Sequence, residues 1–430
     1  MSFTEFTRPI QIKQWQFCES FADRFPRPVH KFIRQMLFGI LKSGSVQLNS
    51  IGRSLQEHIA LKKVTQRLST HLGKADLWRQ ITTATLQTQA ARLRQCRFVI
   101  VDMSDITKKY AQRMEGLAGV YDGSEGEIAQ GFWLCNVTAV NDDATIVVPA
   151  YSELFSHHAE VTSENEKILQ AVELVMPTAA TQKIAVHDRG GDRIVLLEAH
   201  LRANRQCIVR QTTKRHLGYK GKKRSFAYLT RHTELLWTYT IERIHKNKKS
   251  IATYDCGAVA VRLTPNGKSL WLITMKKRRG GYCWLLCYFK NCASAHEAVA
   301  LALKGYGLRW KIEEVHRQIK SDYQYEAIRL LRYEALKTMN ALLWMAASFL
   351  YTRLEPLAHE IVNHVQLGLK NRKREVDLWR FKFYKLALAF KRIMALSQLY
   401  DKIAFPAPSP QLALPFAEPA MRNRQTKNGG

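Results

Sequence analysis

The stretch from Cys96 to about Thr212 constrains the fold more than any other part of the chain. It begins with three apolar segments rich in β-branched residues, separated by turn residues, which is the pattern of consecutive strands. Two segments with helical periodicity follow. A short apolar run that ends in polar residues comes after each of them. In order, the segments are RFVIVDMSDI (97–106), GFWLCNVTAV (131–140), ATIVVPAYSEL (144–154), SENEKILQAVELVM (163–176), KIAVHDRGG (183–191), RIVLLEAHLRAN (193–204) and QCIVRQT (206–212). The order β-β-β-α-β-α-β predicts an α/β fold with a mixed sheet flanked by helices.

The remaining patterns divide the chain into further segments. Short strands alternate with basic clusters after about Thr212, helices resume near Ala295, and a proline-containing tail ends the chain. The expected regions are a helical DNA-binding region (1–95), the first part of the α/β core (96–211), a β-rich basic insertion (212–294), the second part of the core (295–355), a C-terminal helical region that is a candidate for dimerisation (356–404) and a disordered tail (405–430).

Charge indicates the class of partner. The chain has 66 Lys and Arg against 36 Asp and Glu, a net charge of +30. Such a charge attracts polyanions, and nucleic acid rewards each cation through counterion release. In the N-terminal region, the helical pattern Ala60–Leu72 carries side chains that can reach phosphates and base edges. These are Lys62, Lys63, Gln66, Arg67 and Ser69. The alternative is a small helical bundle with a solvated basic face.

Membrane and secreted classes are disfavoured. The longest apolar run, Ala341–Tyr351, is about half of the ~20 residues that a spanning helix needs. The N-terminus shows no signal-peptide pattern. The eight cysteines form no Cys-x-x-Cys pair, so we expect reduced thiols and a cytoplasmic protein, nucleoid-associated in a bacterium.

The segment YGLRWKIEEVHRQIK (306–320) predicts a helix with a chemically distinctive face. At about 100° per residue, Glu313 shares one face with Tyr306 and three cations, and the opposite face is apolar. The cations are Arg309, Arg317 and Lys320. Glu314 lies off this stripe. An acid bracketed by cations suits a metal ligand whose neighbours hold phosphates, although a surface helix with salt bridges has the same pattern.

Two further carboxylates follow strand patterns, where open sheets present functional groups. Asp105 follows the first strand and Asp188 ends the KIAVHD strand before two glycines. Asp102 stands near Asp105 as a competitor. Three acids from separate segments of a basic chain are the hard oxygen ligands that Mg²⁺ and Mn²⁺ accept.

These residues resemble a known family. The spacing Tyr306-x2-Arg309-x3-Glu313-x6-Lys320 is similar to the YREK signature of DDE transposases from cut-and-paste bacterial insertion sequences. VHDRGGD resembles the second-aspartate block of that family, with the ligand at Asp188 and a second acid at Asp192. VDMSDITK resembles the first-aspartate block and places the ligand at Asp105, with Ile106-Thr107 in place of Thr-Thr. The resemblance runs from about Val99 to about Tyr351.

The resemblance implies an RNase H-like catalytic fold interrupted by a β-rich insertion. It implies Mg²⁺, or Mn²⁺ as a substitute, held by Asp105, Asp188 and Glu313. The expected reactions are cleavage of transposon-end DNA, hairpin formation with a flipped base, and strand transfer into target DNA, carried out by a homodimer. Tyr306, Arg309 and Lys320 match the residues that clamp the phosphate, and Trp284 matches the aromatic on which the flipped base stacks. A buried strand tryptophan is the other interpretation of Trp284. Arg210, at the end of QCIVR, is a further expected phosphate contact.

Two alternatives remain at this point. One is a nuclease or resolvase of the same fold that lacks strand transfer. The other is a DNA-binding regulator without chemistry, which predicts that Asp105, Asp188 and Glu313 can be replaced by Ala without loss of function.

Overall fold

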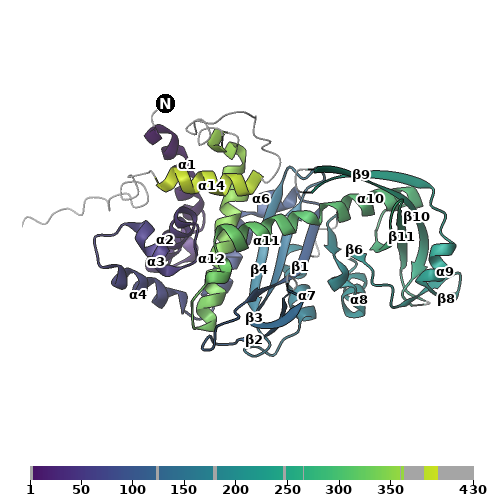
Figure 1. Cartoon of the computed structure of the whole chain (residues 1–430), viewed down its shortest axis with the longest axis horizontal. Helices are drawn as coiled ribbons and strands as arrows, with labels where there is room; N and C mark the ends of the chain where they lie inside the picture. The colour runs from purple at the N-terminus through teal and green to yellow at the C-terminus, as the bar shows by residue number, and fades with distance from the viewer. Residues whose placement is uncertain are drawn as a thin grey trace, which may run out of the picture.

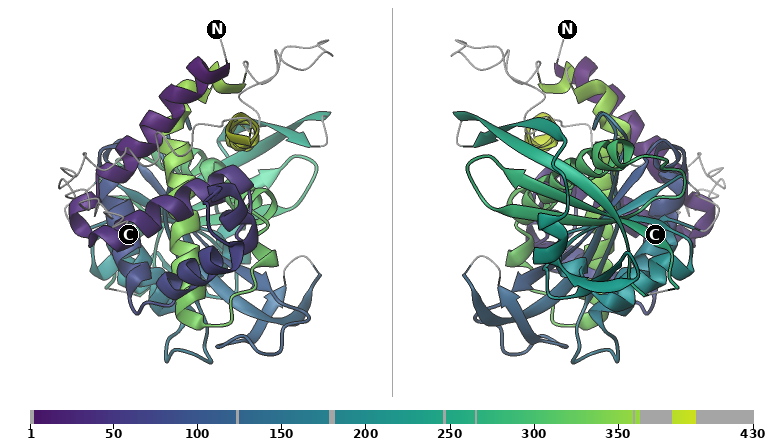
Figure 2. Two further views of the ribbon diagram at one scale, coloured as in Figure 1. Left: turned by 90° about the vertical axis from the view of Figure 1, so that its left-hand side faces the viewer. Right: turned by 90° about the vertical axis from the view of Figure 1, so that its right-hand side faces the viewer.

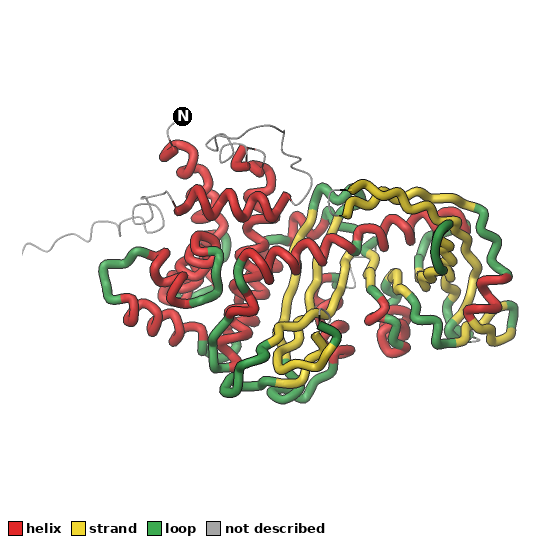
Figure 3. The backbone as a smooth tube through the Cα atoms, in the orientation of Figure 1, coloured by secondary structure: helices red, strands yellow, loops and turns green. Residues whose placement is uncertain are grey.

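The computed structural model describes residues 3–122, 125–177, 182–245, 248–264, 266–358, 360–362 and 382–395. The expected tail (405–430), and most of the C-terminal region beyond residue 362, lie outside these residues. Helices gather at one end of the molecule and strands occupy its middle and other end, as Figure 3 shows.

The predicted order of strands and helices in the core is confirmed. The strands are β1 (Phe98–Thr107), β3 (Glu127–Val140), β4 (Val147–Phe155), β5 (Ile184–His187) and β6 (Gln206–Arg210). The helices α7 (Glu164–Val175) and α8 (Ile194–Arg202) lie where the periodicity predicts them, and the capping box of Ser163 and Glu166 begins α7. The strand β2 (Ala118–Asp122) was not predicted, because it is short and pairs only with the first residues of β3.

All strands of the described chain belong to one mixed 12-stranded sheet. Its order is β2-β3-β1-β5-β6-β12-β11-β10-β7-β8, with β4 paired to β3 and β9 paired to β10. The second half of the sheet comes from β7 (His216–Tyr219), β8 (Lys222–Ser225), β9 (Trp237–His245), β10 (Lys248–Arg262), β11 (Ser269–Lys277) and β12 (Tyr282–Tyr288), with the helix α9 (Phe226–Arg231) between β8 and β9. β1 pairs with β5, and β5 with β6, in parallel, whereas β12 returns antiparallel beside β6.

The N-terminal region is helical, as predicted. It contains α1 (Phe3–Glu19), α2 (Arg27–Ser43), α3 (Leu48–Leu55), α4 (Leu61–Leu72), α5 (Leu77–Thr88) and α6 (Ala90–Arg94). The later helices are α10 (Ala295–Leu308), α11 (Trp310–Asp322), α12 (Tyr333–Phe349) and α14 (Lys382–Ala395). Figure 1 shows α10 and α11 running in sequence across the sheet toward α12, and Figure 2 shows the N-terminal helices and the β9–β11 strands at opposite ends.

The apolar run Ala341–Tyr351 belongs to the core. It forms the second half of α12 and the turn after it, and all of its residues are buried against α2, α5 and β4. Among the described residues, no helix is both long enough and apolar enough to cross a membrane.

The sheet has an apolar core on each face. One cluster includes Ile100, Val186 and Ile208 of three adjacent strands and packs under α10, α11 and α12. The other includes Val99, Ala185 and Cys207 and packs under α7 and α8. The parity of each strand residue therefore decides which layer of helices its side chain meets.

Candidate active site

One row of polar side chains crosses the centre of the sheet. Ile100, Val186 and Ile208 are cross-strand partners on the α11 face. Since side chains alternate along a strand, the residues two positions later share that face. They are Asp102, Asp188 and Arg210. Apolar strands that end together thus place two carboxylates and a guanidinium side by side.

The turn after β5 holds Asp188 at the carboxyl end of its strand. A short 3-10 turn, Arg189–Gly191, follows directly, and the Gly191 amide donates to the Asp188 carbonyl at 2.9 Å. A Cβ on Gly191 would lie 2.4 Å from the Cβ of His187, so no larger residue fits without a shift. The second acid, Asp192, has a buried side chain that accepts from Thr212 and pairs with Arg215. It is tied into the turn and does not join the row.

The helix predicted over 306–320 is interrupted. α10 ends at Leu308, Arg309 forms the junction, and α11 begins at Trp310. Tyr306 therefore lies on α10, while Glu313 and Lys320 lie on α11. Gly305 lets α10 approach the sheet, because a Cβ there would lie 2.5 Å from Ile208 and 2.6 Å from Phe98. The apolar face predicted for the 306–320 helix is confirmed for Ile312, Val315 and Ile319, which are buried.

Asp188 is the centre of a hydrogen-bonded group. The Tyr306 hydroxyl donates to its Oδ1 at 3.0 Å, and Arg210 Nη1 lies 3.4 Å from the same atom. Arg309 Nη1 lies 3.6 Å from Oδ2. Burial alone would raise the pKa of Asp188, but Arg309, the Arg189 backbone amide, Tyr306 and Arg210 together hold it below its usual value. Asp188 is consequently an ionised acceptor.

Arg309 links two carboxylates. Its Nη2 donates to Glu313 Oε1 at 2.6 Å while its Nη1 faces Asp188. The Arg309 side chain is only 15% exposed, whereas Asp188 and Glu313 are 30% and 33% exposed. Glu314 lies outside this group, as its predicted position on the helix indicates, and its carboxylate pairs with Lys311 at 3.0 Å.

Asp102 completes the group electrostatically. Burial raises the pKa of its carboxyl to about 7, against the attraction of Arg309, and the neighbouring Asp188 and Glu313 carboxylates raise it further. A carboxyl with acidic neighbours resists ionisation unless a cation shares the site. The structure therefore brings Asp102, Asp188 and Glu313 into one region of charge.

Asp105, the residue chosen for the first ligand, lies outside this group. It is three positions further along β1 and out of phase with the row. Its nearest cation is Lys320, with Nζ at 3.9 Å, and Lys320 also lies 3.5 Å from Glu326. Burial and the carboxylates of Asp122 and Glu326 raise the pKa of Asp105, and Lys320 opposes them. Of the two competing aspartates, Asp102 lies in the row with Asp188, whereas Asp105 lies beside Lys320.

Trp284 is not brought together with the clamp residues. Its neighbour Leu285 pairs with Arg210 and packs in the core under α10, whereas Trp284 packs in the opposite core. Its indole N–H donates to Thr230 at 2.9 Å, and its ring stacks on Tyr282. This environment matches the interpretation as a strand tryptophan. Another aromatic, Trp310, is 53% exposed beside Arg309 at the start of α11.

His316 was missed by sequence reasoning. Its Nε2 lies 2.9 Å from the Asn136 amide nitrogen, and Asn136 Oδ1 accepts from Ser152. The amide group is thus the donor and Nε2 the acceptor, which leaves the ring proton on Nδ1, 4.0 Å from Asp102 Oδ2. Burial, Lys320 and Arg309 lower the pKa of His316 to about 3, so the ring is neutral. Only the helical phase shared with Glu313 could have indicated this residue.

The chemistry of the carboxylates fits a divalent cation, but their present arrangement is closed. Carboxylate oxygens suit Mg²⁺ and Mn²⁺. Within the described residues, no three His, Cys, Asp or Glu side chains are grouped closely enough to hold an ion as they stand. Arg309 lies between Asp188 and Glu313, with one Nη atom directed to each carboxylate.

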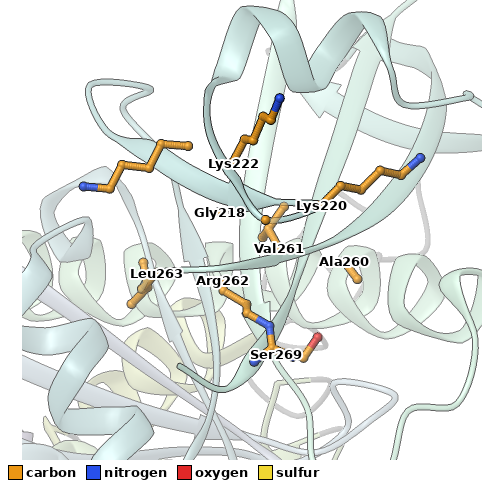
Figure 4. Close-up of a pocket in the computed structure, with 10 residues that line it drawn as sticks. Gly218, Lys220, Lys222, Ala260, Val261, Arg262, Leu263 and Ser269 are labelled. Carbon is orange, nitrogen blue, oxygen red and sulfur yellow. The ribbon is translucent and has the colours of Figure 1, made fainter. Parts of the chain in front are cut away.

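Basic side chains elsewhere do not point toward one common site. A pocket of about 310 Å³ lies between β7, β8 and β10, lined by lysines of the 220–224 cluster and Arg262. In Figure 4, Lys220 and Lys222 point in different directions from its apolar floor. On α4, Lys62, Lys63 and Ser69 are exposed, but Arg67 makes a two-pronged ion pair with Glu57 and is used within the bundle.

Comparison of the chain with protein families and with curated protein sequences finds no match.

Proposed function

We propose that the chain is a DNA transposase that cleaves transposon ends and transfers the freed strand to target DNA. The observation that carries the proposal is the meeting of Asp102, Asp188 and Glu313 beside Tyr306, Arg309 and Arg210 in a chain of charge +30. Three carboxylates from two strands and a helix meet there, and the adjacent guanidinium groups can bind DNA phosphates.

Asp102, Asp188 and Glu313 would hold Mg²⁺, or Mn²⁺ in its place. When bound, two such ions activate a water or a 3′-hydroxyl and stabilise the leaving oxygen. We propose Asp102 in place of Asp105 as the first ligand because of its position in the Asp188 row. His316 Nδ1 lies 4.0 Å from Asp102 Oδ2, beyond hydrogen-bond length, whereas Tyr306 holds the Asp188 carboxylate through a 3.0 Å hydrogen bond.

Arg309 and Arg210 would bind the phosphates next to the cut. In the DNA-free protein Arg309 is shared between Asp188 and Glu313 and offsets part of their negative charge. A DNA phosphate offers the guanidinium a bidentate partner and frees both carboxylates for cations. Substrate binding and cation binding would then be coupled through one side chain.

An RNase H-like core is part of this proposal. Its strands would be β4, β3, β1, β5 and β6, three antiparallel and then parallel, with strands 212–294 as the insertion. The insertion extends the core sheet through the β6–β12 pair, so it reaches the site without a hinge between two sheets.

Purified protein tests the proposal on a labelled duplex that carries the terminal inverted repeat of its own element, with Mg²⁺ and a target plasmid. A transposase yields nicked ends, hairpins and joined target molecules. Nicks and hairpins without joining would favour the nuclease alternative. Binding without any cleavage, unchanged by Asp188→Ala, would favour the non-catalytic regulator.

A further inference from the structure

A groove of about 740 Å³ lies between two segments that adjoin the candidate site. One wall is the segment that continues from β1, residues 107–114, and the other is residues 326–331 after α11. The same strand and helix carry Asp102 and Glu313. Thr107, at the start of the groove, is five residues from Asp102 along β1, about 16 Å at ~3.3 Å per residue.

The walls are fixed to each other. The buried Lys108 ammonium donates to the carbonyls of Glu326 and Ile328, the latter at 2.6 Å. The Glu115 amide donates to the Leu331 carbonyl at 2.8 Å, and the Tyr333 amide donates to the Glu115 carboxylate at 2.8 Å. A groove held in this way exists before any ligand binds, which lowers the entropic cost of binding.

The chemistry of the groove suits a polyanion with flat rings. Its lining has four cations, Lys108, Lys109, Arg113 and Arg329, and one carboxylate, Glu326. Lys108 is committed to carbonyls, Lys109 to Glu127 at 3.4 Å, and Glu326 to Lys320 at 3.5 Å. Arg113 and Arg329 are exposed and, within the described part of the chain, have no carboxylate at ion-pair distance.

Tyr110 adds an aromatic surface. Its side chain is 95% exposed between Lys109 and Arg113. An exposed ring flanked by cations is the combination with which proteins bind single-stranded nucleic acid, because bases stack on the ring while cations hold the phosphates. A duplex keeps its bases stacked on one another and offers such a ring nothing.

We propose that this groove binds single-stranded DNA that is continuous with the strand at the carboxylates. Arg113 and Arg329 hold two of its phosphates, and an unpaired base stacks on Tyr110. At the duplex rise of about 3.4 Å per phosphate, the 16 Å interval corresponds to at most about five nucleotides from the cut, and to fewer in an extended single strand. The proposal rests on the proposed function for the position of the cut, but not for the binding itself.

Binding is therefore measured first, without cleavage. The affinity of the whole protein for a fluorescent single-stranded oligonucleotide is followed across a salt series. For Arg113→Ala/Arg329→Ala, we expect the slope of log K against log salt to fall by about 1.4, about 0.7 for each lost phosphate contact. Arg94→Ala/Arg202→Ala removes two exposed arginines outside the groove. This matched control should keep the slope of the unmodified protein.

The ring is tested by Tyr110→Ala and Tyr110→Phe. The Ala variant should lose about tenfold in single-strand affinity, and the Phe variant should retain it, because Phe keeps the stacking face. Equal slopes for the groove and control variants, a slope change on duplex alone, or equal losses for both Tyr110 variants would each overturn the proposal.

A cleavage series separates this result from the proposed function. Forked substrates carry an unpaired arm of increasing length on one side of the cut or the other. The groove variants should match the unmodified protein with short arms and fall behind once one arm exceeds about five nucleotides. If the groove variants lose single-strand affinity as expected but neither they nor the unmodified protein cleaves DNA, the groove proposal stands and the transposase proposal is contradicted. Cleavage by every variant with identical dependence on arm length would contradict the groove alone.

Discussion

Two clusters of acids and bases lie on this sheet, and they differ in balance. In the first, Glu153 and Glu160 are paired with Lys167 and Lys337 at 2.6–3.4 Å, and tyrosines donate to both carboxylates. In the second, the three carboxyl groups of Asp102, Asp188 and Glu313 have two guanidinium groups close to them, Arg309 and Arg210.

The balanced cluster is also the more deeply buried of the two. Glu153, Lys167 and Lys337 are 3–7% exposed, which requires every charge to be compensated. Although burial opposes it, the two lysines and Tyr333 lower the pKa of Glu160 to about 2. The pKa of Asp102, in contrast, is raised to about 7. The balanced cluster holds β4, α7 and α12 together, and the unbalanced, more accessible cluster is the one at which we propose that a cation binds.

The largest expected effect is on cleavage. Asp188→Ala and Glu313→Ala should each reduce the cleavage rate by about a thousandfold or more, because several kcal/mol of metal-derived stabilisation are lost at 1.36 kcal/mol per tenfold. Binding to end DNA should change little. Glu314→Ala is the control on the same helix. Product formation on denaturing gels gives the rates, and an inactive Glu314 variant beside an active Glu313 variant would contradict the assignment.

The balanced cluster should respond in stability instead. Lys337→Met leaves Glu153 and Glu160 with one lysine and should cost about 3–5 kcal/mol of unfolding free energy. Adding Glu153→Gln should restore part of the loss, since it removes the uncompensated charge. Urea unfolding measures both. If Lys337→Met leaves the free energy of unfolding unchanged but impairs cleavage, this cluster belongs to the catalytic machinery and the distinction between the two clusters is wrong.

Asp102→Asn should stabilise the metal-free protein. A raised folded-state pKa means that ionised Asp102 disfavours the folded state. That penalty is fully present above about pH 7 and disappears below the ordinary value of 3.8. The melting temperature of the Asn variant should thus exceed that of the unmodified protein at pH 8, and most of the difference should be lost near pH 4. An identical difference at both pH values would show that ionisation of Asp102 is not responsible.

The aromatic residues should give the smallest effect. Trp310 is exposed beside Arg309, whereas Trp284 packs on the other face of the sheet. Trp310→Ala should slow hairpin formation by the ~1–3 kcal/mol that stacking of a base contributes, with little effect on nicking. Trp284→Ala should slow both steps only as far as it destabilises the fold. The reverse pattern would restore Trp284 as the stacking residue.

The sequence predicted the core elements but not the neighbours of every site residue. Strands 97–106, 183–191 and 206–212 were recognisable because each is a β-branched apolar run closed by polar residues. The choice between Asp102 and Asp105 depends on parity across β1, β5 and β6. That register arises from long-range pairing, which no local pattern contains.

Two further differences have similar causes. The junction at Arg309 keeps helical dihedral angles, so the pattern over 306–320 gave no break. The placement of Trp284 followed from a resemblance and not from the alternation of Trp284, Leu285 and Leu286, which assigns the tryptophan to the face opposite Arg210. The dimer, the cation and the DNA partners stay predictions.

We propose that Asp102, Asp188 and Glu313, and not Asp105, hold the divalent cation. Titration of Mn²⁺ into the unmodified protein, Asp102→Ala and Asp105→Ala, each with bound end DNA, tests it directly by calorimetry. We expect Mn²⁺ binding to be lost in Asp102→Ala and retained in Asp105→Ala. Retained binding in Asp102→Ala together with loss in Asp105→Ala would contradict the account.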